Sequence, residues 1–335
     1  MQTDVQSDVQ IGARSDAALA WPAPGSLSVV VCAYTDLRWS ELTACIASLR
    51  AQDRVPDEII LVIDHNDHLL ERARDAFSDV AFSDVLVAPN AKTRGLSGAR
   101  NTGTELANGD VIAFVDDDAV VAPGWPRRLL SHYGPAVAGV GGAAHAVWPA
   151  DAPRWLPPEF YWVVGCSWTG LPTSVAPVRN LIGANMSLRR VALEGVGAFN
   201  AAVGRVGTKP VGCEETELCI RVRQRFPGAH FLYDPDLVVD HYLTTDRSRP
   251  RYFVHRCWSE GRSKALVTAT VGTDAGLEAE RRHAFSIIPT ALAGAARDIT
   301  RRQRGAWGRA LALTGGLAVT SAGFAFGRAS ALRRA

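Results

Sequence analysis

Short apolar runs alternate with helix-prone stretches between residues 27 and 118. The apolar runs are rich in valine, isoleucine and leucine, and they lie at residues 27–34, 57–64, 84–89 and 111–118. The helix-prone stretches lie between them, at residues 39–51, 66–77 and 97–110. Runs of this length are typical of buried parallel strands. We therefore predict an α/β fold with an open, mostly parallel sheet and helices on both faces.

Polar residues stand where the predicted strands end. Asp64 closes the second apolar run, residues 92–95 form the loop after the third, and Asp116–Asp118 close the fourth. In such sheets, ligands bind at the carboxyl ends of the strands. We expect these three segments to lie on one rim of the sheet.

The pattern becomes irregular after residue 145. Residues 148–162 are rich in proline and tryptophan, residues 214–226 favour an amphipathic helix, and residues 229–242 predict two short strands. The expected divisions of the chain are a flexible tail at residues 1–24, one catalytic domain at residues 25–265 and a C-terminal helical segment at residues 266–335.

Composition narrows the function classes only slightly. The 335 residues are 47% hydrophobic and 21% charged, with a formal net charge of +2, and we expect no nucleic-acid partner. The six cysteines form no CxxC pair, which predicts reduced thiols in a cytosolic protein, and residues 1–20 lack the apolar core of a secretory signal. No GxGxxG motif and no glycine-rich basic loop follows the first strand, which argues against an oxidoreductase and a nucleotidyltransferase.

Three consecutive aspartates follow a buried strand, and this placement is unfavourable unless another charge neutralises them. Because side chains alternate along a strand, Asp116 and Asp118 can share one side while Asp117 points away. Mg²⁺ or Mn²⁺ commonly binds one or two carboxylates together with phosphate oxygens. The alternative is a solvated acidic turn or the beginning of a helix near Pro123.

Four motifs in order resemble the family 2 glycosyltransferases, which have the GT-A fold. They are "VVVCAYTD" from residue 29, "RGLSGARNTGTELANGDVIAFVDDDAV" (94–120), "GCEETELCIR" (212–221) and "VVDH" (238–241). The resemblance spans about residues 27–265. The four segments are similar, in order, to the family's nucleotide loop, its central DxD signature, the segment of its catalytic base and a strand ending in a metal-contacting histidine.

The resemblance implies a nucleoside site bordered by Ala33, Tyr34 and Asp36. It implies that Asp64 hydrogen-bonds the uracil or the ribose, and the alternative is that Asp64 caps the following helix. The family's commoner "DDGSxD" is replaced here by "IDHND", which leaves the choice of nucleotide open.

The resemblance also implies basic contacts to the diphosphate of the donor. Arg94 precedes a helix, and a guanidinium fork suits phosphate oxygens. Arg100 has the same candidate role, with an exposed position on the helix face as the alternative. Arg262, on the predicted helix after the last strand, is a further candidate.

For the metal, the resemblance implies Asp118 as a direct ligand and His241 as a second ligand through a neutral ring nitrogen. Asp116 would bind the ribose or the metal, and Asp117 would border the donor. The alternative for His241 is a structural histidine at the end of a strand.

Aligned with the family's acidic motif, Glu215 takes the position of the catalytic base, and the assignment could shift to Glu214. Both begin a helix, where the macrodipole favours ionised carboxylates. Glu217 is expected to pair with Arg221, four residues further on. The alternative for these acids is an ordinary solvated helix start.

Two apolar stretches, at residues 285–296 and 310–326, lie in the C-terminal segment. A spanning helix needs about 20 apolar residues, so an interfacial hairpin fits better than a full span. The arginines near these stretches suit an anionic cytoplasmic leaflet, and they are Arg297, Arg301, Arg302, Arg304, Arg309, Arg328, Arg333 and Arg334. The alternative is a pair of helices packed on the catalytic domain. We expect peripheral attachment to the inner face of the plasma membrane.

This segment suggests a lipid-linked acceptor. "FYWVVG", "RNLIGANMSLRR" and "ETELCIR" resemble transferases that extend a sugar-charged dolichyl or polyprenyl phosphate, such as glucosyl-dolichyl-phosphate glucuronosyltransferases. Residues 159–168 either line an acceptor groove or pack in the core. A glucuronosyl donor needs a basic contact, for which Arg179, Arg205 and Lys209 are candidates.

Together, these features predict an inverting, metal-dependent glycosyltransferase that moves a sugar from a UDP-sugar, or less favourably a GDP-sugar, to a glycan or lipid-linked acceptor. The alternative from another class is a non-catalytic sugar- or lipid-binding protein on the same scaffold.

Overall fold

A single twisted sheet organises the fold of the computed structural model, which describes residues 19–201 and 212–332. Among these residues the strands are β1 Leu27–Ala33, β2 Glu58–Ile63, β3 Val85–Pro89, β4 Val111–Asp116, β5 Ala119–Val121, β6 Val137–Val147, β7 Ala176–Val178, β8 Asn185–Arg189 and β9 His230–Tyr242. Their order in the sheet is β3-β2-β1-β4-β8-β6-β9-β5, and β7 pairs with β9.

The two halves of the sheet differ in strand direction. The strands β3, β2, β1 and β4 are parallel, as the alternating sequence pattern predicts. In the second half, β8 runs antiparallel to β4 and β6, whereas β6 and β9 are parallel. The predicted α/β fold is confirmed, and the departures from a parallel sheet follow the part of the chain where the sequence pattern becomes irregular.

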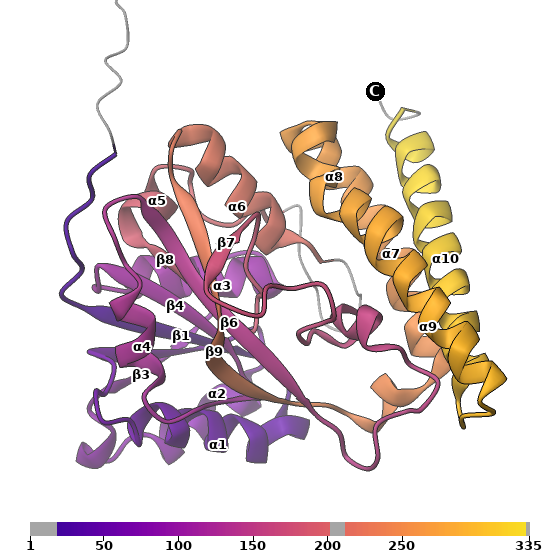
Figure 1. The fold of residues 1–335 in the computed structure, drawn as a ribbon. Coiled ribbons are helices and arrows are strands. Elements are labelled where there is room, and N and C mark those ends of the chain that lie inside the picture. The colour runs from indigo at the N-terminus through magenta and orange to yellow at the C-terminus, as the bar shows by residue number, and fades with distance from the viewer. Residues whose placement is uncertain (1–18, 202–211, 333–335) are drawn as a thin grey trace, which may run out of the picture.

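Helices cover both faces of the sheet (Figure 1). The helices of this part are α1 Trp39–Arg50, α2 Asp67–Ala76, α3 Leu96–Leu106, α4 Trp125–Ser131, α5 Arg190–Glu194 and α6 Glu214–Arg225, with short 3₁₀ turns at Asp36–Arg38, Val80–Phe82 and Thr245–Ser248. Alternate residues of β1 enter different cores. Val29 packs in the core that contains Ile46 of α1, and Val30 packs in the core that contains Ala99 of α3 and Leu218 of α6.

Within the predicted range 229–242, His230–Tyr242 form one 13-residue strand, β9, so the prediction of two short strands is wrong. The pairing of β9 with β6 shifts register after Asp234, where Pro235 interrupts the sequence. A proline cannot donate to the ladder, and a local irregularity lets the strand continue past it. Pro235, which the sequence pattern suggested as a break between two strands, therefore marks a bulge within one longer strand.

The C-terminal helices stand together beside the sheet (Figure 1). They are α7 Pro250–Val271, α8 Thr273–Arg282, a π-helical turn His283–Ile287, α9 Ile288–Thr300 and α10 Ala306–Leu332. The predicted domain boundary at residue 265 falls inside α7. A seven-residue 3₁₀ helix, η3 Pro158–Val164, contacts α7 and α10. Within the described residues, Ala306–Ser330 is long and apolar enough to cross a membrane.

The predicted tail at residues 1–24 is described only from residue 19. Trp21 packs edge-on against Phe226, with ring centroids 5.4 Å apart. Its amide donates to the carbonyl of Pro135 at 2.9 Å, and Arg189 donates to the carbonyl of Pro22 at 2.7 Å. Residues 21 and 22 are therefore held against the domain that contains the sheet. Residues 1–18 lie outside the described part of the chain.

Glycines allow α7 and α10 to pack closely along their length. A Cβ atom built on Gly261 of α7 would lie 2.0 Å from the carbonyl oxygen of Thr320 in α10. A Cβ atom on Gly323 of α10 would lie 2.3 Å from the carbonyl oxygen of Trp258 in α7. Because these contacts are with backbone atoms, a larger side chain must move the whole helix.

Gly323→Leu is expected to destabilise the protein by at least about 1–3 kcal/mol, because it overpacks the α7–α10 contact. Differential scanning fluorimetry measures this as a lower midpoint. Gly315→Leu in the same helix is the matched control, because no atom lies within 4 Å of its added Cβ. The control keeps or raises the midpoint, since leucine is a better helix former than glycine. Equal midpoints for the two variants would contradict the close packing.

Candidate active site

A small pocket opens at the carboxyl ends of β1 and β4, the rim predicted from the sequence. Residues from β1, the turn after it, α3 and the aspartate cluster line the pocket, together with one arginine after β9. They are Cys32, Ala33, Tyr34, Arg38, Asp64, Leu96, Ala99, Asp116, Asp117, Asp118 and Arg247. The structure thus brings together the predicted nucleoside residues Ala33, Tyr34 and Asp64 with the acidic cluster.

Asp118 is the most heavily engaged of the three aspartates. Its carboxylate accepts from Arg38 Nη1 at 2.6 Å and from Arg247 Nη2 at 3.3 Å. His241 Nε2 lies 3.0 Å from its other oxygen. Asp117 pairs with Arg38 at 3.1 Å, and its Oδ2 is buried without a hydrogen-bond partner. Arg38 and Arg247 therefore neutralise Asp117 and Asp118.

Asp116, Asp118 and His241 each offer a ligand atom within 4.8 Å of the others. Two carboxylates suit Mg²⁺ or Mn²⁺, and the imidazole suits a transition metal such as Mn²⁺ better than Mg²⁺. The ring of His241 is held on its other side, where Nδ1 lies 3.4 Å from Cys166 Sγ. Such a second contact fixes the orientation of a ring that binds metal. The residues present therefore fit a divalent ion.

The pKa values of the adjacent Asp117 and Asp118 shift in opposite directions, because their charged neighbours differ. Burial and the adjacent carboxylates raise the pKa of Asp117 to about 7, although Arg38 opposes the rise. Burial would also raise the pKa of Asp118, but the charges of His241 and Arg247 hold it well below its ordinary value. Burial lowers the pKa of His241, and the Asp118 carboxylate overcomes this effect and raises it to about 10. Of these two aspartates, Asp118 therefore keeps its charge to lower pH than Asp117 does.

Asp64 is fixed at the base of the pocket. Its carboxylate accepts from the amide of Gly95 at 2.9 Å and from Asn90 Nδ2 at 2.6 Å. The alternative in which Asp64 caps the next helix is wrong, because Asn66 accepts from the amide of Leu69 and caps α2. Asp64 therefore orders the loop before α3 and keeps its place in the pocket.

Asp36 and Arg94, which were predicted to contact the donor, lie outside the pocket lining, as do Arg100 and Arg262. Asp36 faces α2, where it accepts from Asn66 Nδ2 at 3.1 Å and lies 2.9 Å from His68 Nδ1. Arg94 is exposed and donates to the carbonyl of His65 at 3.1 Å. Contacts of these residues with a donor remain predictions.

Arg100 is buried, so the alternative of an exposed helix-face charge is wrong. Its guanidinium lies 3.1 Å from Glu214 Oε1 and 3.3 Å from Asp116 Oδ1, and it donates to the carbonyl of Gly183 at 2.9 Å. It therefore joins the end of β4 to the beginning of α6. Glu214 Oε2 is buried without a hydrogen-bond partner.

Glu215 stands at the first turn of α6, beside Glu214. Burial and the charge of Glu214 raise the pKa of Glu215 to about 7. Glu217 is occupied by Arg221 at 2.8 Å, as their spacing predicts. Of the three acids, Glu215 has a raised pKa and forms no ion pair with another described residue, whereas Glu214 and Glu217 each pair with an arginine.

The basic residues Lys264 and Arg262 of α7 contact the C-terminal helices and do not line the pocket. Lys264 is buried and lies 2.8 Å from Glu280 of α8 and 3.6 Å from Glu260. Arg179, a candidate for a sugar carboxylate, pairs with Glu280 at 2.6 Å. Arg262 lies over the ring of Phe326 in α10, outside the pocket lining. Arg205 and Lys209 lie outside the described residues.

Sequence reasoning missed Arg38 and Arg247. Arg38 lies in the turn after β1, where a basic residue was sought only within a glycine-rich loop. Arg247 follows the predicted metal-binding histidine by six residues, and its Nη1 also donates to the carbonyl of Val164 at 2.9 Å. The sequence contained one signal for both residues. Each arginine follows a residue that was predicted to belong to the site, Asp36 for Arg38 and His241 for Arg247.

Comparisons with known proteins agree with this geometry. Residues 28–197 match the pattern of Glycosyl transferase family 2. The chain is 35% identical to the glucosyl-dolichyl phosphate glucuronosyltransferase of Haloferax volcanii over 243 residues, which are 72% of this chain and 77% of that protein.

Two solved structures share the fold at low sequence identity. A mannosyltransferase from Pyrobaculum calidifontis, in complex with GDP-Man and Mn²⁺, has a TM-score of 0.57 and 18% identity, covering 93% of this chain and 87% of that one. GalNAc-T7 with UDP, GalNAc and Mn²⁺ has a TM-score of 0.51 and 17% identity, covering 86% and 59%. The predicted family is confirmed, and the chain belongs to glycosyl transferase family 2.

Proposed function

We propose that this glycosyltransferase moves a sugar, a hexose or a hexuronic acid, from a UDP-sugar to a hydroxyl of a lipid-linked acceptor, with inversion at the anomeric carbon. The observation that carries the proposal is the pocket lined by Tyr34, Asp64 and the aspartate cluster. His241 offers a further ligand atom within 4.8 Å of those of Asp116 and Asp118. A nucleotide fits the side of Tyr34 and Asp64, and its diphosphate fits the acidic cluster once a divalent cation is bound.

In this proposal, Asp118, Asp116 and His241 hold Mg²⁺ or Mn²⁺. The bound ion supplies positive charge that stabilises the departing nucleoside diphosphate. Arg38 and Arg247 line the same pocket, and their guanidinium groups suit the remaining phosphate oxygens.

Glu215 is the proposed base. It takes the proton of the acceptor hydroxyl while the hydroxyl oxygen attacks the anomeric carbon from the face opposite the diphosphate. The bond to the diphosphate oxygen breaks, and its electron pair leaves with that oxygen. Glu214 is less suited to this role, because Arg100 holds its carboxylate in a buried ion pair.

A lipid-linked acceptor is supported by the named activity of the Haloferax relative and by the C-terminal helices. Only 22% of the apolar window of α10 is buried within the protein. Exposed Arg301, Arg302 and Arg304 connect α9 to α10, where they suit the anionic headgroups of a membrane surface. We propose peripheral attachment to the cytoplasmic face of the plasma membrane.

A thermal-shift screen tests the donor site. In the presence of Mn²⁺, UDP or a UDP-sugar is expected to raise the unfolding midpoint, because a ligand that binds only the native state stabilises it. EDTA is expected to remove that increase, and GDP is expected to produce a smaller one. A folded protein whose midpoint no nucleotide changes in the presence of Mn²⁺ would argue for a non-catalytic scaffold.

A further inference from the structure

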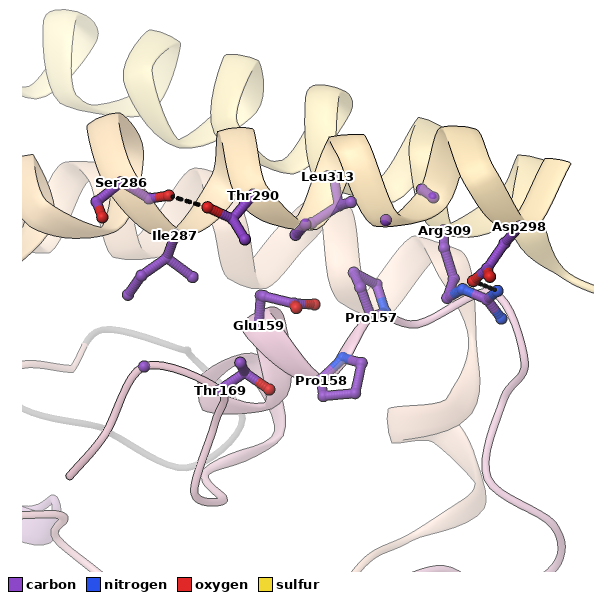
Figure 2. Close-up of a pocket in the computed structure, with 14 residues that line it drawn as sticks. Pro157, Pro158, Glu159, Thr169, Ser286, Ile287, Thr290, Asp298, Arg309 and Leu313 are labelled. Carbon is purple, nitrogen blue, oxygen red and sulfur yellow. Dashed lines mark hydrogen bonds and ion pairs between the residues drawn. The ribbon is translucent and has the colours of Figure 1, made fainter. Parts of the chain in front are cut away.

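A second and larger cavity lies between the catalytic domain and the C-terminal helices (Figure 2). Its volume is about 430 Å³, within the range of about 300–1,000 Å³ that is typical of ligand pockets. Its lining residues come from η3, the loop that follows it, the π-helical turn, α9 and α10. Those that give it an apolar surface are Pro157, Pro158, Gly170, Ile287, Ala291, Gly294, Ala295 and Leu313.

Charged groups at this groove are few and largely satisfied. Figure 2 shows Asp298 and Arg309 facing each other at one end, where Arg309 Nη2 lies 2.6 Å from Asp298 Oδ2. Glu159 is half-buried and keeps part of its surface in solvent. Thr290 donates its hydroxyl to the carbonyl of Ser286 within its own helix at 3.0 Å. The walls therefore offer a ligand apolar surface more than unpaired charge.

One wall of the groove leads to the active site. The 3₁₀ helix η3 contributes Pro158 to the groove and ends at Val164, whose carbonyl accepts from Arg247 Nη1. The other terminal nitrogen of Arg247 lies 3.3 Å from Asp118. A 3₁₀ helix rises about 2.0 Å per residue, so the six steps from Pro158 to Val164 span about 12 Å. The groove is therefore one short helix away from the acidic cluster.

The opposite wall belongs to the helices with membrane character. Trp307 and Leu311 of α10 are 70% and 69% exposed. Arg301, Arg302 and Arg304 follow α9 just beyond the Asp298–Arg309 end of the groove and are exposed. An apolar groove that ends beside exposed cations is complementary to a molecule with a hydrocarbon chain and an anionic group.

We propose that this groove binds the hydrocarbon chain of an isoprenoid phosphate acceptor, so that its sugar reaches the active site along η3. The inference rests on the proposed function and deepens it by locating the lipid part of the acceptor. A soluble glycan does not need such a groove, because its hydroxyl groups would face apolar walls without hydrogen-bond partners.

Gly294 provides a direct test, because it lines the groove and no atom lies within 4 Å of an added Cβ. Gly294→Trp therefore fills the groove without a clash at the backbone. Gly315→Trp is the matched control, with equally open space on α10 but outside the groove. The probes are farnesyl phosphate and methyl phosphate, whose binding to the full chain is measured by isothermal titration calorimetry.

Farnesyl phosphate is expected to bind the wild type and the control alike, and far more tightly than methyl phosphate does. Gly294→Trp is expected to weaken the binding of farnesyl phosphate at least about tenfold. The tryptophan displaces part of the hydrocarbon chain, and each buried methylene contributes about fourfold in affinity. Equal affinity in the two variants, or no preference for farnesyl phosphate over methyl phosphate, overturns the groove assignment.

The nucleotide thermal shift separates this failure from a failure of the proposed function. Suppose that UDP and Mn²⁺ still stabilise every variant, while Gly294→Trp leaves the affinity for farnesyl phosphate unchanged. The donor site is then supported and the groove assignment is wrong. If UDP and Mn²⁺ stabilise no form of the protein, the transferase proposal itself is wrong, whatever the lipid does.

Discussion

Glu215→Gln is expected to lower kcat by about 10²–10⁴-fold, the usual contribution of a positioned general base. Glutamine keeps the shape of the side chain but cannot accept the proton of the acceptor hydroxyl. The midpoint of unfolding should stay the same or rise, because burial and Glu214 disfavour the charge that the substitution removes. Turnover assays and scanning fluorimetry measure the two effects separately.

Glu214→Gln is the matched control for that experiment. It removes the charge that faces the buried guanidinium of Arg100, so it is expected to lower the unfolding midpoint. Near-normal turnover in Glu215→Gln, together with loss of turnover in a stable Glu214→Gln protein, would move the base to Glu214.

The pH dependence of turnover follows from the same carboxyl group. A base must be deprotonated, and the pKa of Glu215 is raised to about 7. The rate should therefore rise with pH up to about 7 and fall about tenfold per unit below it. The linked stability has the opposite direction: the protonated form is favoured in the folded state, so stability falls as pH rises from the ordinary range of a glutamate towards 7. Glu215→Gln should reduce that slope, and the part that comes from Asp117, whose pKa is also raised to about 7, should remain.

Asp118→Asn is expected to abolish the EDTA-sensitive stabilisation by UDP and to lower the stability of the ligand-free protein. The loss of UDP binding is expected because the substitution removes one of the three proposed metal ligands, Asp116, Asp118 and His241. The stability effect follows because Arg38 and Arg247 lose the carboxylate that neutralises them in a buried position. Removing one partner of a buried ion pair typically costs about 3–5 kcal/mol.

Asp117→Asn is the control for the metal site, because Asp117 pairs with Arg38 and is not part of the three-residue cluster. It is expected to retain Mn²⁺-dependent binding of UDP, measured by calorimetry. The metal assignment fails if Asp118→Asn folds and still binds UDP in an EDTA-sensitive way.

The elements that the sequence predicts well are those with local signals. β1 and β2 are short β-branched runs, and α2 begins with a capping asparagine, so each could be identified from a few consecutive residues. β9 was misjudged because Pro235 resembles the end of a strand when its partner β6 is unknown.

The ion pairs of the site could not be predicted in the same way. Arg38 lies 80 residues from Asp118, and Arg247 lies 129 residues from it. No periodic pattern connects such positions, because the folded sheet alone brings them together. Arg100 shows the same limit: its helix position was evident, but its burial depends on Glu214, 114 residues away.

The course of α7 bears on how this enzyme could be shortened or recombined. A chain cut at residue 265 would end in the middle of α7 and would leave the buried cations Arg179 and Lys264 without Glu280 of α8. The helical segment is therefore not an exchangeable tail. A hybrid that takes this segment from another transferase must also keep matching partners for Arg179 and Lys264. The residues on both sides of this contact must therefore be exchanged together.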